Sequence, residues 1–453
     1  MMQSKPVLEL KTSARELLAF LVLWVILFIE PLYLGPLKIA HLWKIVVLAY
    51  LIYETPKPRL PIWLIFGVLY ALKYLVYTKI PYGLVESLQN AAEALILPLL
   101  MWFLYNRYRL SSDYASKLLR FSVAMAFFFI YSAVPFLLGL EGFHPDTSLD
   151  KYGLEMNATK GLFYHIAVAS QVYTLATLVL MSAYGLFKFG ILGRIVYLGT
   201  VLIGVYLVYG TFARTAWLAF IAVALFVFFS GYGVRRKLVG MLLACGVVIS
   251  AYAIYETNEA VQLRMSGGAT YRQDTELSVG GLVSARVPFV FVAADNLSEA
   301  GLLSIVLGYG AQYGMDLFEK KTGMAIVSHN KTMEILEASG LVGLFLYLGF
   351  VGCVFRLVKK GYFRSDQASK KVTMVCGLLF AFFYLGSHGL PFWGEAIISG
   401  VLVANILRGR PANAAVRPFT ASSAPWSDAG RGRTAALKEP TAVLASKRGS
   451  TIR

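Results

Sequence analysis

Charge is scarce in this 453-residue sequence, and acidic residues are the scarcer part of it. Only 15% of the residues are Asp, Glu, Lys or Arg, while 58% are hydrophobic. Ordinary soluble domains carry roughly 25% charged residues, so the composition argues against a water-soluble chain of this length. The formal net charge is +17 and the mean hydropathy is +0.64. Together these values predict a membrane protein with an excess of basic residues.

Cysteine is also rare. The three cysteines, Cys245, Cys353 and Cys376, fall inside or at the edges of apolar stretches, where cysteine behaves as a small packing residue. The Cys and His spacing typical of a metal site is missing. The sequence therefore predicts no metal, and we expect no cofactor.

Long apolar runs are abundant. We count about 12 runs near the ~20 residues that an α-helix needs to cross a bilayer. They are Leu17–Leu34, 39–53, 61–77, 88–106, Leu118–Leu140, 161–187, Ile195–Phe212, Ala213–Ser230, 238–256, Leu341–Leu357, 373–388 and 393–408. The first run is too long for a cleaved signal peptide, so we expect it to remain as an anchor. The expected fold is an all-α polytopic membrane protein.

Four regions follow from these runs. Residues 1–256 hold transmembrane helices 1–9, and residues 257–340 form one large polar loop. Residues 341–408 hold helices 10–12. Residues 409–453 are rich in Ala, Arg, Pro, Ser and Thr without apolar periodicity, which indicates a disordered tail.

The positions of lysine and arginine predict the orientation in the membrane. Basic residues precede the first run and follow the even-numbered ones, and such segments face the cytoplasm. They are Lys5, Lys11, Arg15; Lys57, Arg59; Arg107, Arg109, Lys117, Arg120; Lys188, Arg194; Arg235, Arg236, Lys237; and Arg356, Lys359, Lys360, Arg364, Lys370, Lys371. The C-terminal tail is therefore expected in the cytoplasm, and the loop 257–340 outside. The basic face favours contact with anionic membrane lipids over nucleic acid.

Three outward residues are the first candidates for chemistry. Arg214 begins an apolar run within Tyr209–Trp217, and Arg286 lies in Ser284–Pro288 ahead of another apolar stretch. His329 precedes a segment with helical spacing that leads into the tenth run. Arg214 also fits an interfacial arginine beside Trp217, and Arg286 a surface arginine on an amphipathic helix. A histidine can act as a base at neutral pH.

Weaker candidates surround them. Arg264 and Arg272 lie in the same loop, and His388 lies at an outward turn beside Trp393 and Glu395. A belt of interfacial aromatic residues accounts for the last group equally well.

Two arginines and a histidine on one face suit a lipid diphosphate substrate. Guanidinium groups bind phosphate oxygens with paired hydrogen bonds and stabilise the charge that develops as the diphosphate leaves. The histidine could accept a proton from an incoming hydroxyl group. Paired outward carboxylates at metal-binding spacing are missing, which favours group transfer without a metal.

The chain resembles the superfamily of bacterial O-antigen ligases and O-antigen polymerases. The matching pieces are Thr211–Trp217, Ser284–Arg286 with Gly308–Gly310, and Ser328–Asn330 followed by Ser339–Gly343. Their order around one long outward loop also matches, over roughly residues 160–400. Each motif is short, and the specificity comes from their order and topology together.

The resemblance implies a GT-C-like fold in the bacterial inner membrane and an active site that faces the periplasm. It implies an undecaprenyl-diphosphate-linked glycan as donor and an inverting, metal-independent glycosyl transfer. By motif position, Arg214 and Arg286 would bind the diphosphate, His329 would be the catalytic base, and Gly308 and Gly310 would shape the loop. The motifs do not extend to Arg264, Arg272 or His388.

Three functions stay open at this point. The preferred one is an O-antigen ligase whose acceptor is the lipid A–core oligosaccharide. An O-antigen or exopolysaccharide polymerase would use the same type of donor. A lipid-linked glycan transporter or flippase belongs to a different class, in which Lys73 and Glu93 could serve as intramembrane charges. The outward loop favours an enzyme, because a flippase has no need of it.

Overall fold

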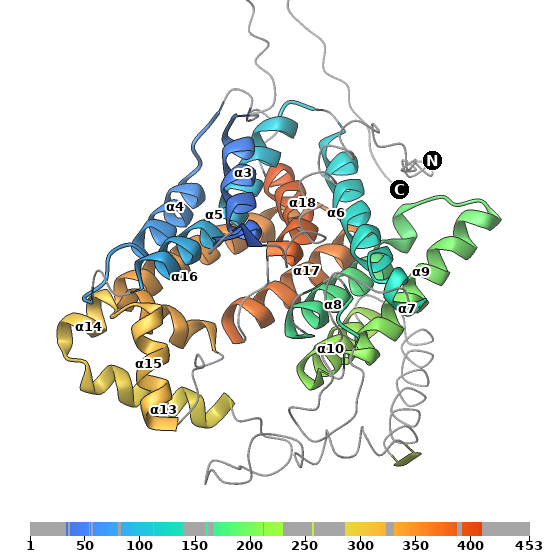
Figure 1. The fold of residues 1–453 in the computed structure, drawn as a ribbon. Coiled ribbons are helices and arrows are strands. Elements are labelled where there is room, and N and C mark those ends of the chain that lie inside the picture. Colours follow the sequence, from blue (N-terminus) through green and yellow to red (C-terminus); the bar gives the residue numbers. More distant parts are fainter. Residues whose placement is uncertain are drawn as a thin grey trace, which may run out of the picture.

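The computed structural model describes the helical body of the chain (Figure 1). The structure describes residues 33–34, 37–53, 55, 58–79, 83–111, 113–138, 159–161, 163, 166–211, 213–229, 256–257, 286–322, 330–386 and 392–409. The predicted runs 17–34 and 238–256 lie largely or wholly outside them, as does the tail after residue 409.

The described part is almost entirely α-helical. Two short strands, β1 (Tyr33–Leu34) and β2 (Leu37–Lys38), pair antiparallel before the first helix. The helices are α3 (Ile39–Tyr53), α4 (Ile62–Lys73), α5 (Leu84–Tyr108), α6 (Tyr114–Tyr131), α7 (Val134–Leu137), α8 (Ile166–Ala183), η2 (Tyr184–Leu186), α9 (Ile191–Gly210), α10 (Arg214–Phe229), α13 (Arg286–Glu299), α14 (Leu302–Leu307), α15 (Ala311–Thr322), α16 (Lys331–Phe363), α17 (Gln367–Gly386) and α18 (Phe392–Arg408).

Five helical stretches within the described residues are long and apolar enough to cross a membrane. They are Leu84–Tyr108, Tyr114–Leu137, Ile166–Leu186, Ile191–Gly210 and Lys331–Phe363. Shorter apolar helices occur at Lys44–Tyr53, Ile62–Lys73 and Thr215–Val227. The all-helical class and the presence of membrane-spanning candidates are therefore confirmed, whereas the count of about 12 spans stays a prediction from run length.

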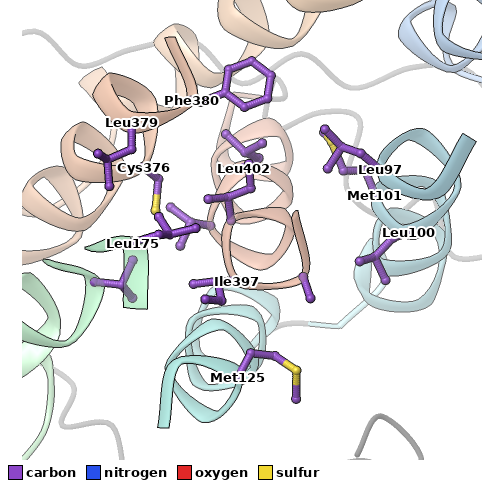
Figure 2. Close-up of a cluster of buried hydrophobic side chains, with 14 of the residues drawn as sticks. Leu97, Leu100, Met101, Met125, Leu175, Cys376, Leu379, Phe380, Ile397 and Leu402 are labelled. Carbon is purple, nitrogen blue, oxygen red and sulfur yellow. The ribbon is translucent and has the colours of Figure 1, made fainter. Parts of the chain in front are cut away.

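Helix α18 forms the centre of the bundle. It packs against α5, α6, α8, α16 and α17, and residues on all its sides are buried. Figure 2 shows Ile397 and Leu402 of α18 surrounded by side chains from the neighbouring helices, among them Leu97, Met101, Met125, Leu175 and Cys376. A helix that is apolar all round can be stable only when other helices or lipid surround it, and here helices do so.

The outer faces of the bundle expose large apolar side chains. On α9, Ile191 is 81% exposed and Leu202 is 69% exposed. Such surface is costly in water but is the ordinary surface of a helix against lipid tails. The arrangement is that of a protein built for a membrane.

A small polar network closes the bundle where α16, α17 and α18 meet. The side-chain amide of Asn405 donates to Thr373 Oγ1 at 2.8 Å, and Ser365 Oγ donates to Asn405 Oδ1 at 3.3 Å. Arg408 donates to Ser365 Oγ at 2.8 Å. Because buried polar groups need partners, this network explains how Asn405 is accommodated at 1% exposure.

We predict that Gly400→Ala destabilises the protein, because α18 and α6 touch through this glycine. A Cβ atom at Gly400 would approach Leu118 O to 2.5 Å, and overpacking of this kind costs about 1–3 kcal/mol. The control is Gly352→Ala on α16, where a Cβ atom would meet nothing within 4 Å. Thermal unfolding in detergent should show a lower Tm for Gly400→Ala and an unchanged or higher Tm for Gly352→Ala. Equal Tm values for the two variants would refute this packing.

Candidate active site

The two predicted diphosphate-binding arginines each begin a helix. Arg214 is the first residue of α10, and Arg286 is the first residue of α13. Neither helix has an acidic residue in its first turn, so no carboxylate of that turn offsets the partial positive charge of the helix N-terminus. An anion at either place would be stabilised by the helix end and by an arginine from the same position.

Helix α16 begins directly after the predicted base. Asn330 is its N-cap, and the Asn330 side chain accepts hydrogen bonds from the N–H groups of Thr332 and Met333 at 3.1 and 3.2 Å. Asparagine is among the best N-cap residues, so the chain direction at residue 330 is fixed. His329 itself lies outside the described residues, as do Arg264, Arg272 and His388.

Gly308 lies in direct backbone contact with α16. Its φ is +79°, and a Cβ atom there would approach Ala338 O and Ser339 N to 2.5 Å. Gly340 interrupts α16 with φ 63° and ψ −167°, and a Cβ atom there would approach Gly308 N to 2.5 Å. Both positions require glycine twice over, for the positive φ and for the space. The Gly308–Gly310 and Ser339–Gly343 motifs therefore form one structural unit.

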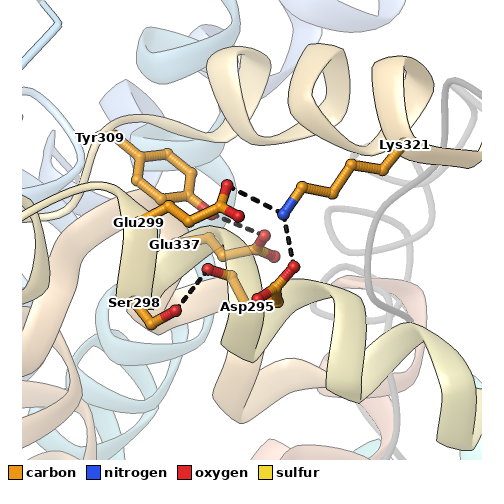
Figure 3. Close-up of polar contacts among 6 residues, drawn as sticks. All are labelled: Asp295, Ser298, Glu299, Tyr309, Lys321 and Glu337. Atoms are coloured by element: carbon orange, nitrogen blue, oxygen red, sulfur yellow. Dashed lines mark hydrogen bonds and ion pairs between the residues drawn. The ribbon is translucent and has the colours of Figure 1, made fainter.

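Tyr309 and Glu337 bind each other through both backbone and side chain. Tyr309 N donates to Glu337 O at 2.9 Å, and Tyr309 Oη donates to Glu337 Oε1 at 2.8 Å (Figure 3). Tyr309 is fully buried and Glu337 is 5% exposed. Burial, reinforced by the neighbouring carboxylate of Glu337, raises the pKa of Tyr309. The raised pKa keeps the phenol of Tyr309 protonated, so it remains the donor in its hydrogen bond to Glu337.

The end of α4 holds the same loop from the other side. Lys73 Nζ donates to Leu307 O at 2.7 Å, and it also donates to Val76 O. Thr78 donates to Gly308 O through both its N–H and its hydroxyl group, at 3.0 Å in each case. A lysine at the C-terminal ends of helices also offsets their partial negative charge. Lys73 thus fixes the loop in place.

The outer helices are joined by an ion-pair network. Lys321 of α15 contacts Asp295 of α13 at 2.6 Å and Glu299 of α13 at 3.0 Å (Figure 3). The hydrogen bond to Asp295 raises the pKa of Lys321. Exposed pairs of this kind contribute about 0–1 kcal/mol each, so they set orientation more than stability. Helix α13, which begins at Arg286, also packs against α16.

An aromatic pair closes the turn ahead of Arg214. Trp217 Nε1 donates to Val208 O at 3.0 Å, and the rings of Tyr209 and Trp217 stack with centroids 5.9 Å apart. These contacts hold the end of α9 against the start of α10. Helix α10 packs mainly against α8 and α17, whereas the Arg286 helix packs against α15 and α16. Both helices lie in the lower half of Figure 1.

Sequence reasoning missed the contacts that assemble this site. Glu337 has no role among the predictions from sequence, where Lys73 is only a possible intramembrane charge. Tyr309 is predicted to have no role of its own and is only the middle residue of the motif Gly308–Gly310. The one available signal was glycine on both sides of Tyr309, because glycine marks close approach of backbone segments.

Fold and composition thus define a helical protein with helices able to cross a membrane. Comparison with protein-family models and with curated proteins found no match for the chain.

We predict that Gly308→Ala is far more disruptive than Gly301→Ala. Both glycines have positive φ, +79° and +81°, with ψ near 160°, a conformation almost restricted to glycine, so both variants suffer backbone strain of about 1–3 kcal/mol. Only Gly308 also lacks room, because a Cβ atom at Gly301 would meet nothing within 4 Å. Thermal unfolding in detergent should show the larger loss of Tm for Gly308→Ala. Similar losses would mean that the backbone contact with α16 is absent.

Proposed function

We propose that this protein is a membrane glycosyltransferase of the O-antigen ligase type. It would transfer a glycan from undecaprenyl diphosphate to the lipid A–core oligosaccharide at the periplasmic face of the bacterial inner membrane. The transfer would be metal-independent and would invert the anomeric centre. The polymerase reaction uses the same donor and differs in its acceptor.

The observation that carries the proposal is the unit formed by Gly308, Gly340 and the first turns of α16. Two motifs that resemble the family meet here through backbone contacts. The third, Ser328–Asn330, ends at the N-cap of the same helix. Of the three matching pieces of sequence, the second and third therefore meet at α16, which supports a shared function better than either piece alone.

The proposed chemistry assigns a role to each predicted residue. Arg214 and Arg286 hold the diphosphate, with the N-termini of α10 and α13 adding positive potential. His329 takes the proton from an acceptor hydroxyl group, whose oxygen forms a bond to the anomeric carbon. The bond from that carbon to the phosphate oxygen breaks, and its electron pair leaves with undecaprenyl diphosphate. Attack opposite the leaving group inverts the centre.

The transporter alternative relied on charges within the membrane. In the structure Lys73 donates to two backbone carbonyls, and Glu93 pairs with Lys44. Engaged in this way, both residues suit fixed structural or binding roles better than a path along which a substrate moves. This favours the enzyme over the flippase.

We predict that His329→Ala abolishes transfer. Loss of a general base lowers the rate by about 100-fold to 10,000-fold. The variant is expressed in a strain that lacks this chain, and lipopolysaccharide banding and lipid-linked glycan are measured. Cores without O-antigen together with accumulated lipid-linked chains are the expected result. The control is His144→Ala, a histidine on the same predicted side that has no assigned role.

Two other outcomes would count against the proposal. Cores that carry a single repeat would indicate a polymerase. Normal banding in the His329→Ala strain, with the variant present in the membrane, would indicate a protein without this catalytic step.

A further inference from the structure

Four ionisable side chains from three helices converge between α5, α16 and α18. We name them the Lys331 cluster: Glu93 of α5, Lys331 and Glu334 of α16, and Glu395 of α18. Lys331 Nζ lies 3.9 Å from Glu334 Oε2. The same ammonium group interacts electrostatically with Glu93, with Glu395 and with Tyr74, which follows α4.

Tyrosines cover one side of the Lys331 cluster. Tyr347 is 2% exposed and interacts with Glu334, Glu395 and Tyr74. Tyr70 and Tyr74 share a hydrogen bond of 2.7 Å between their hydroxyl groups. The cluster therefore brings carboxylates, an ammonium group and phenols together in a protein whose outer faces are apolar.

Such a group is costly to keep in a membrane protein. Charged side chains that keep little exposed surface are rare unless they are paired or functional, and Glu395 is only 7% exposed. Burial of charges also contributes little net stability compared with apolar packing. The need to hold α16 against α18 does not explain the cluster, because apolar contacts elsewhere along the same pair achieve that.

Lys331 itself points to a bound molecule. Its nearest carboxylate oxygen is 3.9 Å away, which is too far for a hydrogen bond. Within the described residues its ammonium group makes no hydrogen bond. The side chains of Lys331 and Glu334 keep 24% and 16% of their surface accessible. An ammonium group in this state has donors left for water or for oxygens of a ligand.

We propose that the Lys331 cluster binds hydroxyl groups of the acceptor sugar, an inference that rests on the proposed function. With Lys44, which pairs with Glu93, two lysines stand against three carboxylates. The net negative charge would repel a diphosphate but suits uncharged hydroxyl groups, which donate to carboxylates and accept from lysine. No three His, Cys, Asp or Glu side chains in the described part are arranged to hold a metal ion.

The position along the chain assigns these hydroxyl groups to the acceptor. His329 and Lys331 are two residues apart, so their Cα atoms lie within about 7.6 Å of each other. Asn330 fixes the intervening backbone through its capping hydrogen bonds. In the proposed reaction the acceptor hydroxyl group is bound near residue 329, so the sugar that carries it would be near the start of α16, where Lys331 and Glu334 lie. The donor diphosphate, which needs cations, belongs to the arginines.

The test uses Glu334→Gln and Glu395→Gln in the full-length protein in nanodiscs. Two probes are titrated separately, lipopolysaccharide that carries lipid A–core but no O-antigen, and undecaprenyl diphosphate. Each substitution replaces a carboxylate acceptor by a neutral amide, which makes a weaker hydrogen bond to a sugar hydroxyl group. We expect the Kd for the lipid A–core probe to rise by about 10-fold or more and the Kd for undecaprenyl diphosphate to stay within about twofold.

The matched control is Glu299→Gln, which makes the same change at an exposed carboxylate on α13 paired with Lys321. It should alter neither Kd. If either variant at the cluster fails to fold, Glu334→Asp keeps the charge and retracts it by one methylene, and its Kd for lipid A–core should rise as well.

The results separate this inference from the proposed function. If both cluster variants bind lipid A–core like the unaltered protein, or lose both probes equally, the cluster is structural and the inference fails. If the unaltered protein binds neither probe, the proposed function fails first. If it binds undecaprenyl diphosphate alone, the donor half survives and the acceptor inference is overturned.

Discussion

The backbone contact between Gly308 and the bend of α16 at Gly340 is the constraint on which the rest of the site depends. It joins helices outside the five candidate spans, α13 to α15, to a helix long enough to cross a membrane. Three side chains reinforce it: Lys73 and Thr78 from the end of α4, and Tyr309, which is bonded to Glu337. Because backbone touches backbone at this point, neither segment can shift without the other. The loop and α16 therefore have to move together.

The positions of the charged residues favour separate binding places for donor and acceptor in the proposed reaction. Arginines begin α10 and α13 without acidic neighbours in the first turn. The Lys331 cluster, by contrast, is net negative and lined by tyrosines. In the proposed reaction, a phosphate would be attracted to these arginines and repelled by the Lys331 cluster, whereas sugar hydroxyl groups would suit the cluster. This separation would orient donor and acceptor before the reaction begins. Holding two reactants in the right geometry is one way in which enzymes lower the activation barrier.

Much of the helical body could be predicted from apolar periodicity and run length, because those depend on local sequence. The run 88–106 matches α5, and the predicted border between loop and span falls at Gly340, where α16 bends. The run Leu118–Leu140 is instead split into α6 and α7, with Pro135 at the start of the second helix. The contacts of the site could not be predicted, since Lys73 and Leu307 are 234 residues apart and Lys331 meets partners from three other helices. No local pattern carries that information.

In the proposed reaction, guanidinium groups at the starts of α10 and α13 hold a lipid diphosphate. The most direct measurement is native mass spectrometry of the full-length protein in nanodiscs, titrated with undecaprenyl diphosphate and with undecaprenol. We expect the protein to bind undecaprenyl diphosphate about 100-fold or more tightly than undecaprenol. Each charge-assisted hydrogen bond to the diphosphate contributes about 1.5–3 kcal/mol. We also expect that Arg214→Gln and Arg286→Gln each remove at least about tenfold of that preference. Equal affinity of the unaltered protein for the two lipids would contradict the account.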